Sequence, residues 1–122
     1  MRALTLLALL LPVVPALGQT APAPAPGRYA LTQAECRSGE IFLTLAKDRL
    51  DLPVLSCTGL AFTPEASGGG DRERWSVSAK ACTAEGEEKP APKRFRLEAR
   101  GTALRILWAD GTNSAWMARC GR

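Results

Sequence analysis

Residues 93–120, KRFRLEARGTALRILWADGTNSAWMARC, decide the fold. The first run, residues 94–100, alternates apolar with charged side chains, and a period of two is typical of a strand with one buried and one solvated face. Two further apolar runs follow it. The pairs Gly-Thr at 101–102 and Asp-Gly at 110–111 separate these runs and are typical of two-residue hairpin turns. The stretch therefore predicts a three-stranded antiparallel meander.

The two turns predict the same inner face. The first turn places Leu97 opposite Ile106, and the second places Leu104 opposite Met117. A slip of one residue would turn every apolar side chain outward, so the agreement of two independent turns supports this register. The predicted inner face consists of Phe95, Leu97, Leu104, Ile106, Trp108, Ala115 and Met117.

The outer face of the meander carries the candidate binding residues. In the same register Glu98 lies opposite Arg105, and Arg105 lies opposite Trp116. Tryptophan stacks with guanidinium groups, and both residue types are enriched in binding hot spots. The candidate binding face consists of Arg94, Arg96, Arg100, Arg105 and Trp116. The alternative is a solvated sheet face, with a structural Glu98 to Arg105 pair and with Trp116 covered by the proline-rich N-terminal segment or a loop.

The chain upstream of the meander predicts further short strands. Alternating or apolar runs occur at residues 28–32, 40–46, 49–54, 58–63 and 74–82. A helical turn is expected near 32–37, and polar loops are expected at 65–71 and 83–92. Seven or eight short strands separated by turn signals predict an all-β antiparallel domain, either a small barrel or a sandwich. The neighbour-to-neighbour order of the strands favours the barrel.

Three segments are expected along the chain. Residues 1–18 have one positive charge, a leucine-rich core and a small-x-small end, which is typical of a secretory signal peptide cleaved near Gly18, with Ala16 as the alternative. The apolar run is shorter than the roughly 20 residues that span a membrane, so the mature form is expected to have no membrane span. Residues 19–27 predict an extended Ala/Pro-rich linker. Residues 28–122 form a single disulfide-stabilised β domain.

Four cysteines behind an export signal predict two disulfides. The chain has no histidine and no C-x-x-C pair, which argues against a zinc site. Three pairings are open from the sequence. We expect Cys36–Cys57, because these residues bracket a hairpin, and Cys82–Cys120, because both fall on outward positions of their strands.

Charge and composition limit the classes of binding partner and the cellular compartments that are expected. Removing Arg2 with the signal peptide leaves fifteen Lys and Arg against twelve Asp and Glu, a net charge of +3. This excess is too small to predict nucleic-acid binding. Arginine outnumbers lysine twelve to four and Ala, Pro and Gly abound, a pattern typical of a GC-rich genome. We therefore expect a bacterial protein that is periplasmic or secreted.

The residues available for catalysis are few. The absence of histidine removes Ser-His-Asp and Cys-His nucleophile systems. The remaining candidates are the carboxylates Asp48, Asp51, Glu85, Glu87 and Glu88, the strand-face set Ser76, Ser78 and Lys80, and oxygen ligands for calcium at residues 110–113. Solvated loops, a wet sheet face and a hairpin turn explain these patterns better. No enzyme activity, metal or cofactor is expected.

Three functional hypotheses remain. The first is a non-enzymatic binding module, with an inhibitor as one form of it, whose partner is an envelope protein or an anionic glycan. The second is a small envelope hydrolase that uses carboxylates. The third is a passive structural protein of the envelope.

Overall fold

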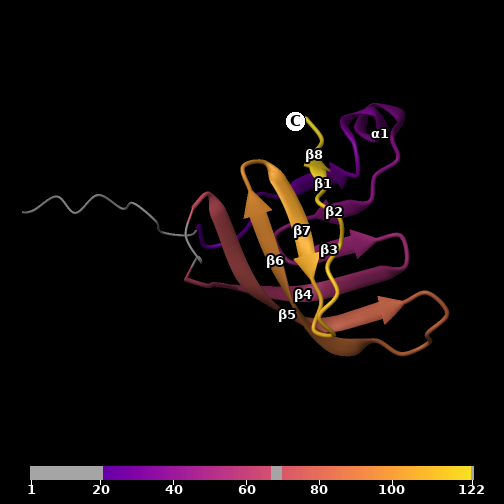
Figure 1. Ribbon diagram of the computed structural model, residues 1–122. Coiled ribbons are helices and arrows are strands. Elements are labelled where there is room, and N and C mark those ends of the chain that lie inside the picture. Colours follow the sequence, from indigo (N-terminus) through magenta and orange to yellow (C-terminus); the bar gives the residue numbers. More distant parts are fainter. Residues whose placement is uncertain (1–20, 67–69, 122) are drawn as a thin grey trace, which may run out of the picture.

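The alternating runs form one antiparallel sheet that curls into a nearly closed barrel (Figure 1). The structure is a computed structural model, and it describes residues 21–66 and 70–121. The elements are β1 (Gly27–Ala30), α1 (Gln33–Ser38), β2 (Leu43–Leu45), β3 (Arg49–Leu52), β4 (Leu55–Pro64), β5 (Arg72–Ala84), β6 (Ala91–Arg100), β7 (Ala103–Leu107) and β8 (Ala118–Arg119). The sheet order is β7-β6-β5-β4-β3-β2-β1-β8. The prediction of an all-β antiparallel barrel is confirmed.

The barrel closes between its last strands and its first. Met117, directly before β8, exchanges two backbone hydrogen bonds with Leu104 of β7, at N···O distances of 3.0 and 2.8 Å. One residue further on, β8 pairs with β1, with Ala118 opposite Ala30. The C-terminal segment therefore joins the two ends of an otherwise sequential sheet.

The β6–β7 hairpin has the predicted register, with Leu97 opposite Ile106 and Glu98 opposite Arg105. Of the predicted inner face, the residues at most 3 % exposed are Phe95, Leu97, Leu104, Ile106 and Met117. Trp108 is half-buried and packs against Phe95, with ring centroids 5.5 Å apart. This hairpin forms one wall of the hydrophobic core.

The prediction is wrong for the third strand of the meander. The turn is a three-residue loop, in which Trp108 N donates to Thr112 O (2.8 Å) and Gly111 adopts a φ of 91°. Ile106 N then donates to the side-chain Oγ of Ser114, at 2.8 Å, instead of to a backbone oxygen. One extra residue between Ser114 and Met117 then restores the predicted pairing of Leu104 with Met117. Ala115 is exposed instead of buried.

Two local features change the direction of side chains upstream. β3 ends at Leu52 because Pro53 and Val54 form the two-residue turn that sets Leu52 opposite Leu55, and Val54 is 59 % exposed rather than inward. In β4, Gly59 has a φ of 66°, and a Cβ there would lie 2.8 Å from the Cβ of Lys80 on β5. The register of β5 against β6 shifts by one residue near this point. This bulge turns Cys82 inward.

The predicted disulfide pairs are wrong. The structure pairs Cys36 with Cys120 (Cα–Cα 5.3 Å) and Cys57 with Cys82 (Cα–Cα 4.0 Å). Cys57 lies on β4 directly opposite Cys82 on β5, whereas Cys36 lies on α1, beside β1 and β8. Cys36 and Cys57 do not meet, because α1 lies beside β1 and two strands separate β1 from β4. Cys82 does not point outward, because the bulge in β5 precedes it.

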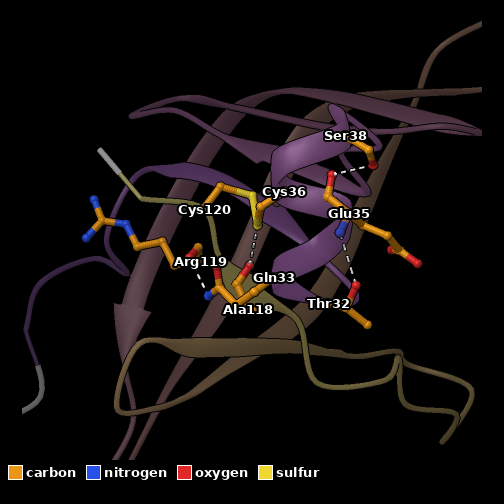
Figure 2. The surroundings of a disulfide bond; sticks show 8 residues. All are labelled: Thr32, Gln33, Glu35, Cys36, Ser38, Ala118, Arg119 and Cys120. Atoms are coloured by element: carbon orange, nitrogen blue, oxygen red, sulfur yellow. Dashed lines mark hydrogen bonds between the residues drawn. A yellow bond between two sulfur atoms is a disulfide. The ribbon is translucent and has the colours of Figure 1, made fainter.

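Helix α1 is held to the end of the sheet by the first disulfide (Figure 2). Thr32 caps the helix by accepting a hydrogen bond from Glu35 N at 3.1 Å, and Gly39 ends it with a φ of 82°. Gln33 Nε2 donates to the backbone oxygen of Arg119 at 3.3 Å. The predicted helical turn near 32–37 is thus confirmed, and it is anchored to the C-terminal segment.

A tryptic map under non-reducing conditions checks the two pairs directly. Cleavage after Lys and Arg, except before Pro90, gives cysteine-containing peptides of residues 29–37, 50–72, 81–93 and 120–122. We expect the peptide 29–37 linked to 120–122, and 50–72 linked to 81–93. Recovery of 29–37 linked to 50–72 would instead restore the pairing expected from the sequence.

The predicted signal peptide, residues 1–18, lies outside the described residues. Of the predicted linker, residues 19–27, the structure describes 21–27; Gly27 belongs to β1, and residues 21–26 contact the barrel. The backbone oxygen of Ala21 accepts a hydrogen bond from Trp75 Nε1, and that of Ala25 accepts one from the Tyr29 hydroxyl, both at 2.6 Å. This segment therefore covers Trp75 rather than Trp116. Within residues 21–66 and 70–121, no helix is long and apolar enough to cross a bilayer.

Candidate binding face of the barrel

The candidate face is the outer surface of β4, β5, β6 and β7. Antiparallel pairing sets the outward side chains in rows across these strands. One row holds Ala61, Ser78 and Arg94; the next holds Thr63, Ser76, Arg96 and Leu107; a third holds Arg74, Glu98 and Arg105. Residues directly opposite each other have Cβ atoms about 4.5–5.5 Å apart. The outer face therefore changes from short hydroxyl side chains to a charged cluster along β6.

Glu98 is the centre of the charged cluster. Its side chain points outward from the sheet but is 0 % exposed, because arginine side chains cover it. Arg74 Nε donates to Glu98 Oε2, while Arg105 donates to Oε1 through Nη2 (2.6 Å) and Nε (2.8 Å). Arg72 lies further away, with Nη1 3.9 Å from Oε1. One carboxylate thus holds two arginines from different strands in place.

The pKa of Glu98 lies below its ordinary value of 4.5. Burial alone would raise the pKa of this carboxyl group, since it penalises the charged form. The hydrogen bonds from Arg74 and Arg105, together with their positive charges, outweigh that effect and favour the ionised form. Glu98 is therefore a fixed anion at neutral pH and unsuited to act as a proton donor.

Trp116 packs against the same cluster. The Cζ atoms of Arg100 and Arg105 lie 4.7 and 4.6 Å from the centroid of the Trp116 ring, within cation–π distance. The tryptophan is only half-buried, and arginines of the chain itself cover it. Arg105 is committed to Glu98 as well. At this end of the candidate face, arginine and tryptophan mainly satisfy one another.

Arg94 and Arg96 lie at the other end of the face, beside an open groove. The groove has a volume of about 530 Å³, and its lining includes Ala61, Thr63, Ser76, Ser78, Arg94, Arg96, Leu107 and Trp108. Among the residues that the structure describes, Arg94 makes no ion pair. Arg96 keeps 50 % of its side chain exposed, with Nη1 3.9 Å from Glu65 Oε2. These two arginines are the cations of the predicted set that remain available to a ligand.

The catalytic candidates occupy positions that a simpler role explains. Asp51 accepts hydrogen bonds from Arg49 Nε and Ser56 Oγ, both 2.8 Å long. The Arg49 bond above all holds the pKa of Asp51 below 3.8. Asp48 and the loop carboxylates Glu85, Glu87 and Glu88 are exposed. Asp51 is thus an ionised partner in a structural network.

The serine and turn candidates are likewise engaged locally. Ser76 Oγ donates to Glu65 Oε1 at 3.0 Å, and the stem of Lys80 lies over Gly59. Asp110 Oδ1 accepts from both the N (2.8 Å) and Oγ1 (2.6 Å) of Thr112, so it closes its own turn. Across the described ranges, no group of three or more metal-ligating side chains comes together.

The sequence predicts the two arginines of the groove but not the groove itself. Alternation placed Arg94 and Arg96 on one face, but the hydroxyl floor comes from β4 and β5, which are joined through the loop near residues 65–71. The sequence of that loop does not define a register. No family of known proteins, curated protein or solved structure matches this chain.

Proposed function

We propose that this protein is a non-enzymatic binding module that recognises an anionic ligand on the outer face of its barrel. The observation that carries the proposal is the position of Arg94 and Arg96, side by side along β6 at the open groove. Two residues apart on a strand, they are separated by about 6.6–6.8 Å along the chain direction. Guanidinium groups bind carboxylate, phosphate or sulfate through paired hydrogen bonds.

The rest of the proposal concerns where the protein acts. Two disulfides are consistent with an oxidising compartment. Together with the signal-peptide composition of residues 1–18 and the arginine-rich, GC-type composition, this supports a bacterial protein that is periplasmic or secreted. Its partner would then be an anionic component of the cell envelope.

The test compares two double variants of equal net charge. Arg94→Ser with Arg96→Ser removes the cations at the groove, whereas Arg28→Ser with Arg37→Ser removes two exposed arginines of β1 and α1. Binding to dextran sulfate and to poly-glutamate at moderate salt is measured for both. We expect the groove variant to bind at least about tenfold more weakly than wild type, because charge-assisted hydrogen bonds are lost.

The control variant should lose much less affinity, through the change in net charge alone. An equal loss in both variants would show that the protein binds anions through its overall charge, and the groove would have no special role. Failure of the wild-type protein to bind either polymer would also overturn the proposal.

A further inference from the structure

We propose that the groove of Arg94 and Arg96 is built for a sugar acid, that is, a sugar unit bearing a carboxylate, as part of an acidic glycan. This inference rests on the proposed function and names its ligand class. The acid group would bind the arginines, and the sugar hydroxyls would meet the floor of the groove. Three parts of the groove support this assignment.

The floor is made of short side chains on neighbouring strands. Ala61 lies opposite Ser78, and Thr63 lies opposite Ser76. Short side chains leave the outer surface hollow between β4 and β6, which accounts for a groove on the face of a sheet. A serine or threonine hydroxyl both donates and accepts hydrogen bonds, as a sugar hydroxyl does. Ser76 Oγ already donates to Glu65 Oε1, so the floor hydroxyls offered to a ligand are those of Thr63 and Ser78.

The cationic side of the groove is in register with this floor. Arg94 lies opposite Ser78, and Arg96 lies opposite Ser76. Each row therefore sets a guanidinium group next to a hydroxyl, with Cβ atoms about 5 Å apart. A matching ligand carries an acid group and hydroxyl groups within a few ångströms of one another. The ring of a sugar acid has this arrangement.

The end of the groove is apolar. Leu107 and Trp108 line it, and Trp108 is held from the inside by its contact with Phe95 at 5.5 Å. Because Trp108 is only half-buried, part of its side chain remains open to a ligand. The aromatic face carries partial negative charge and is attracted to the weakly positive C–H groups on one face of a sugar ring. A rigid aromatic wall thus completes a site with both polar and apolar sides.

Other anionic ligands fit this groove less well. An extended acidic peptide is usually bound by adding a strand to an exposed sheet edge, but β4, β5 and β6 are paired on both sides. Inorganic phosphate would use the arginines but would leave the hydroxyl floor and the apolar wall without a partner. The volume of about 530 Å³ lies in the range of about 300–1,000 Å³ that is typical of small-ligand sites.

The experiment measures the binding of four probes to the full mature domain by calorimetry: tri-galacturonate, the neutral galactose trisaccharide, a hexaglutamate peptide and inorganic phosphate. We expect tri-galacturonate to bind at least about tenfold more tightly than hexaglutamate or phosphate, and the neutral trisaccharide to bind weakest. Arg94→Ser with Arg96→Ser should abolish the preference for the acidic sugar.

A second variant tests the floor separately from the charge. Thr63→Val with Ser78→Ala removes two hydroxyl groups from exposed strand positions and leaves all charges in place. We expect it to weaken the binding of tri-galacturonate by about fivefold or more and to leave the binding of hexaglutamate unchanged. Its urea denaturation midpoint, compared with that of the wild type, shows that the fold is intact.

The outcomes separate this inference from the proposed function. If hexaglutamate or phosphate binds as tightly as tri-galacturonate through the two arginines, the sugar assignment is wrong and the anion-binding function stands. If the floor variant binds tri-galacturonate like the wild type, the hydroxyls take no part and the assignment is again overturned. If no anionic probe binds, or if the arginine variant binds them all unchanged, both proposals fail.

Discussion

Removal of the Cys36–Cys120 disulfide is expected to be the most destabilising single change in this protein. These cysteines are 84 residues apart in the sequence, so their bond closes most of the domain into one loop. The chain-entropy treatment of a loop of that length gives about 4.5 kcal/mol of stabilisation, against about 3.5 kcal/mol for the shorter loop of the other disulfide. The Cys36→Ala, Cys120→Ala variant should lose about that much free energy of unfolding.

A local effect should accompany this loss. Helix α1 has six residues and none of them is buried, and an isolated helix of this length is unstable in water. Without the disulfide we expect the amide protons of α1 to exchange with solvent much faster than those of β5 and β6. Urea unfolding and hydrogen exchange measure the two effects. A variant with an unchanged unfolding midpoint and a protected helix would contradict both expectations.

The second large effect is expected from Glu98→Gln. This change leaves Arg74 and Arg105 facing each other with no anion between them. Breaking a buried ion pair costs about 3–5 kcal/mol, but these arginines keep 34 % and 21 % of their side chains exposed. Solvent screening reduces the penalty, so we expect a loss of about 2–4 kcal/mol in the free energy of unfolding at pH 7.

The pH dependence of this loss identifies its cause. Because the folded state lowers the pKa of Glu98, the ionised carboxylate stabilises the fold above about pH 4.5, and this stabilisation disappears as the pH falls through the lowered pKa. The difference between wild type and Glu98→Gln should therefore be constant near neutral pH and shrink below pH 4.5. Glu87→Gln, in an exposed loop, is the matched control and should change stability little at any pH. A penalty for Glu98→Gln that persists in acid would point to packing rather than charge.

Local pairing made the central part of the fold predictable. In the β6–β7 hairpin, both the turn and the alternation of side chains lie within residues 91–107. The third strand departed from prediction because its turn has three residues instead of two, and because Ser114 uses its side chain, not its backbone, to satisfy Ile106 N. A sequence pattern of apolar residues does not distinguish these two acceptors, so the position of Ala115 was predicted wrongly.

The disulfides depended on information that periodicity lacks. Gly59 and Lys80 lie across from each other where β4 and β5 bend, and the extra residue in β5 reverses the direction of Cys82. Neither residue signals a bulge by itself, since each also occurs in regular strands. The disulfide pairing depends on the position of this bulge, which the alternation of apolar and polar residues does not indicate.

The candidate site, like the fold, was predictable only where it depends on local pairing. Arg94 and Arg96 were placed on one outer face by alternation, and the structure puts them at the groove. The burial of Glu98 required Arg74, which belongs to β5, before the loop at residues 85–90 that leads to β6. The cluster at this end of the face therefore depends on a long-range register, which is the least predictable part of a β domain.

The way in which the barrel closes also constrains how the chain folds. From β1 to β7 each strand pairs with the next one along the sequence, so these contacts form between nearby segments. The contact of β8 with β1 joins residues about ninety positions apart, and such distant contacts carry the largest loop-closure entropy. The open sheet is therefore expected to assemble first and the β1–β8 seam last. Until then both edges of the sheet stay unpaired. The Cys36–Cys120 bond lies across this seam, so in the finished barrel it would hinder the separation of β8 from β1.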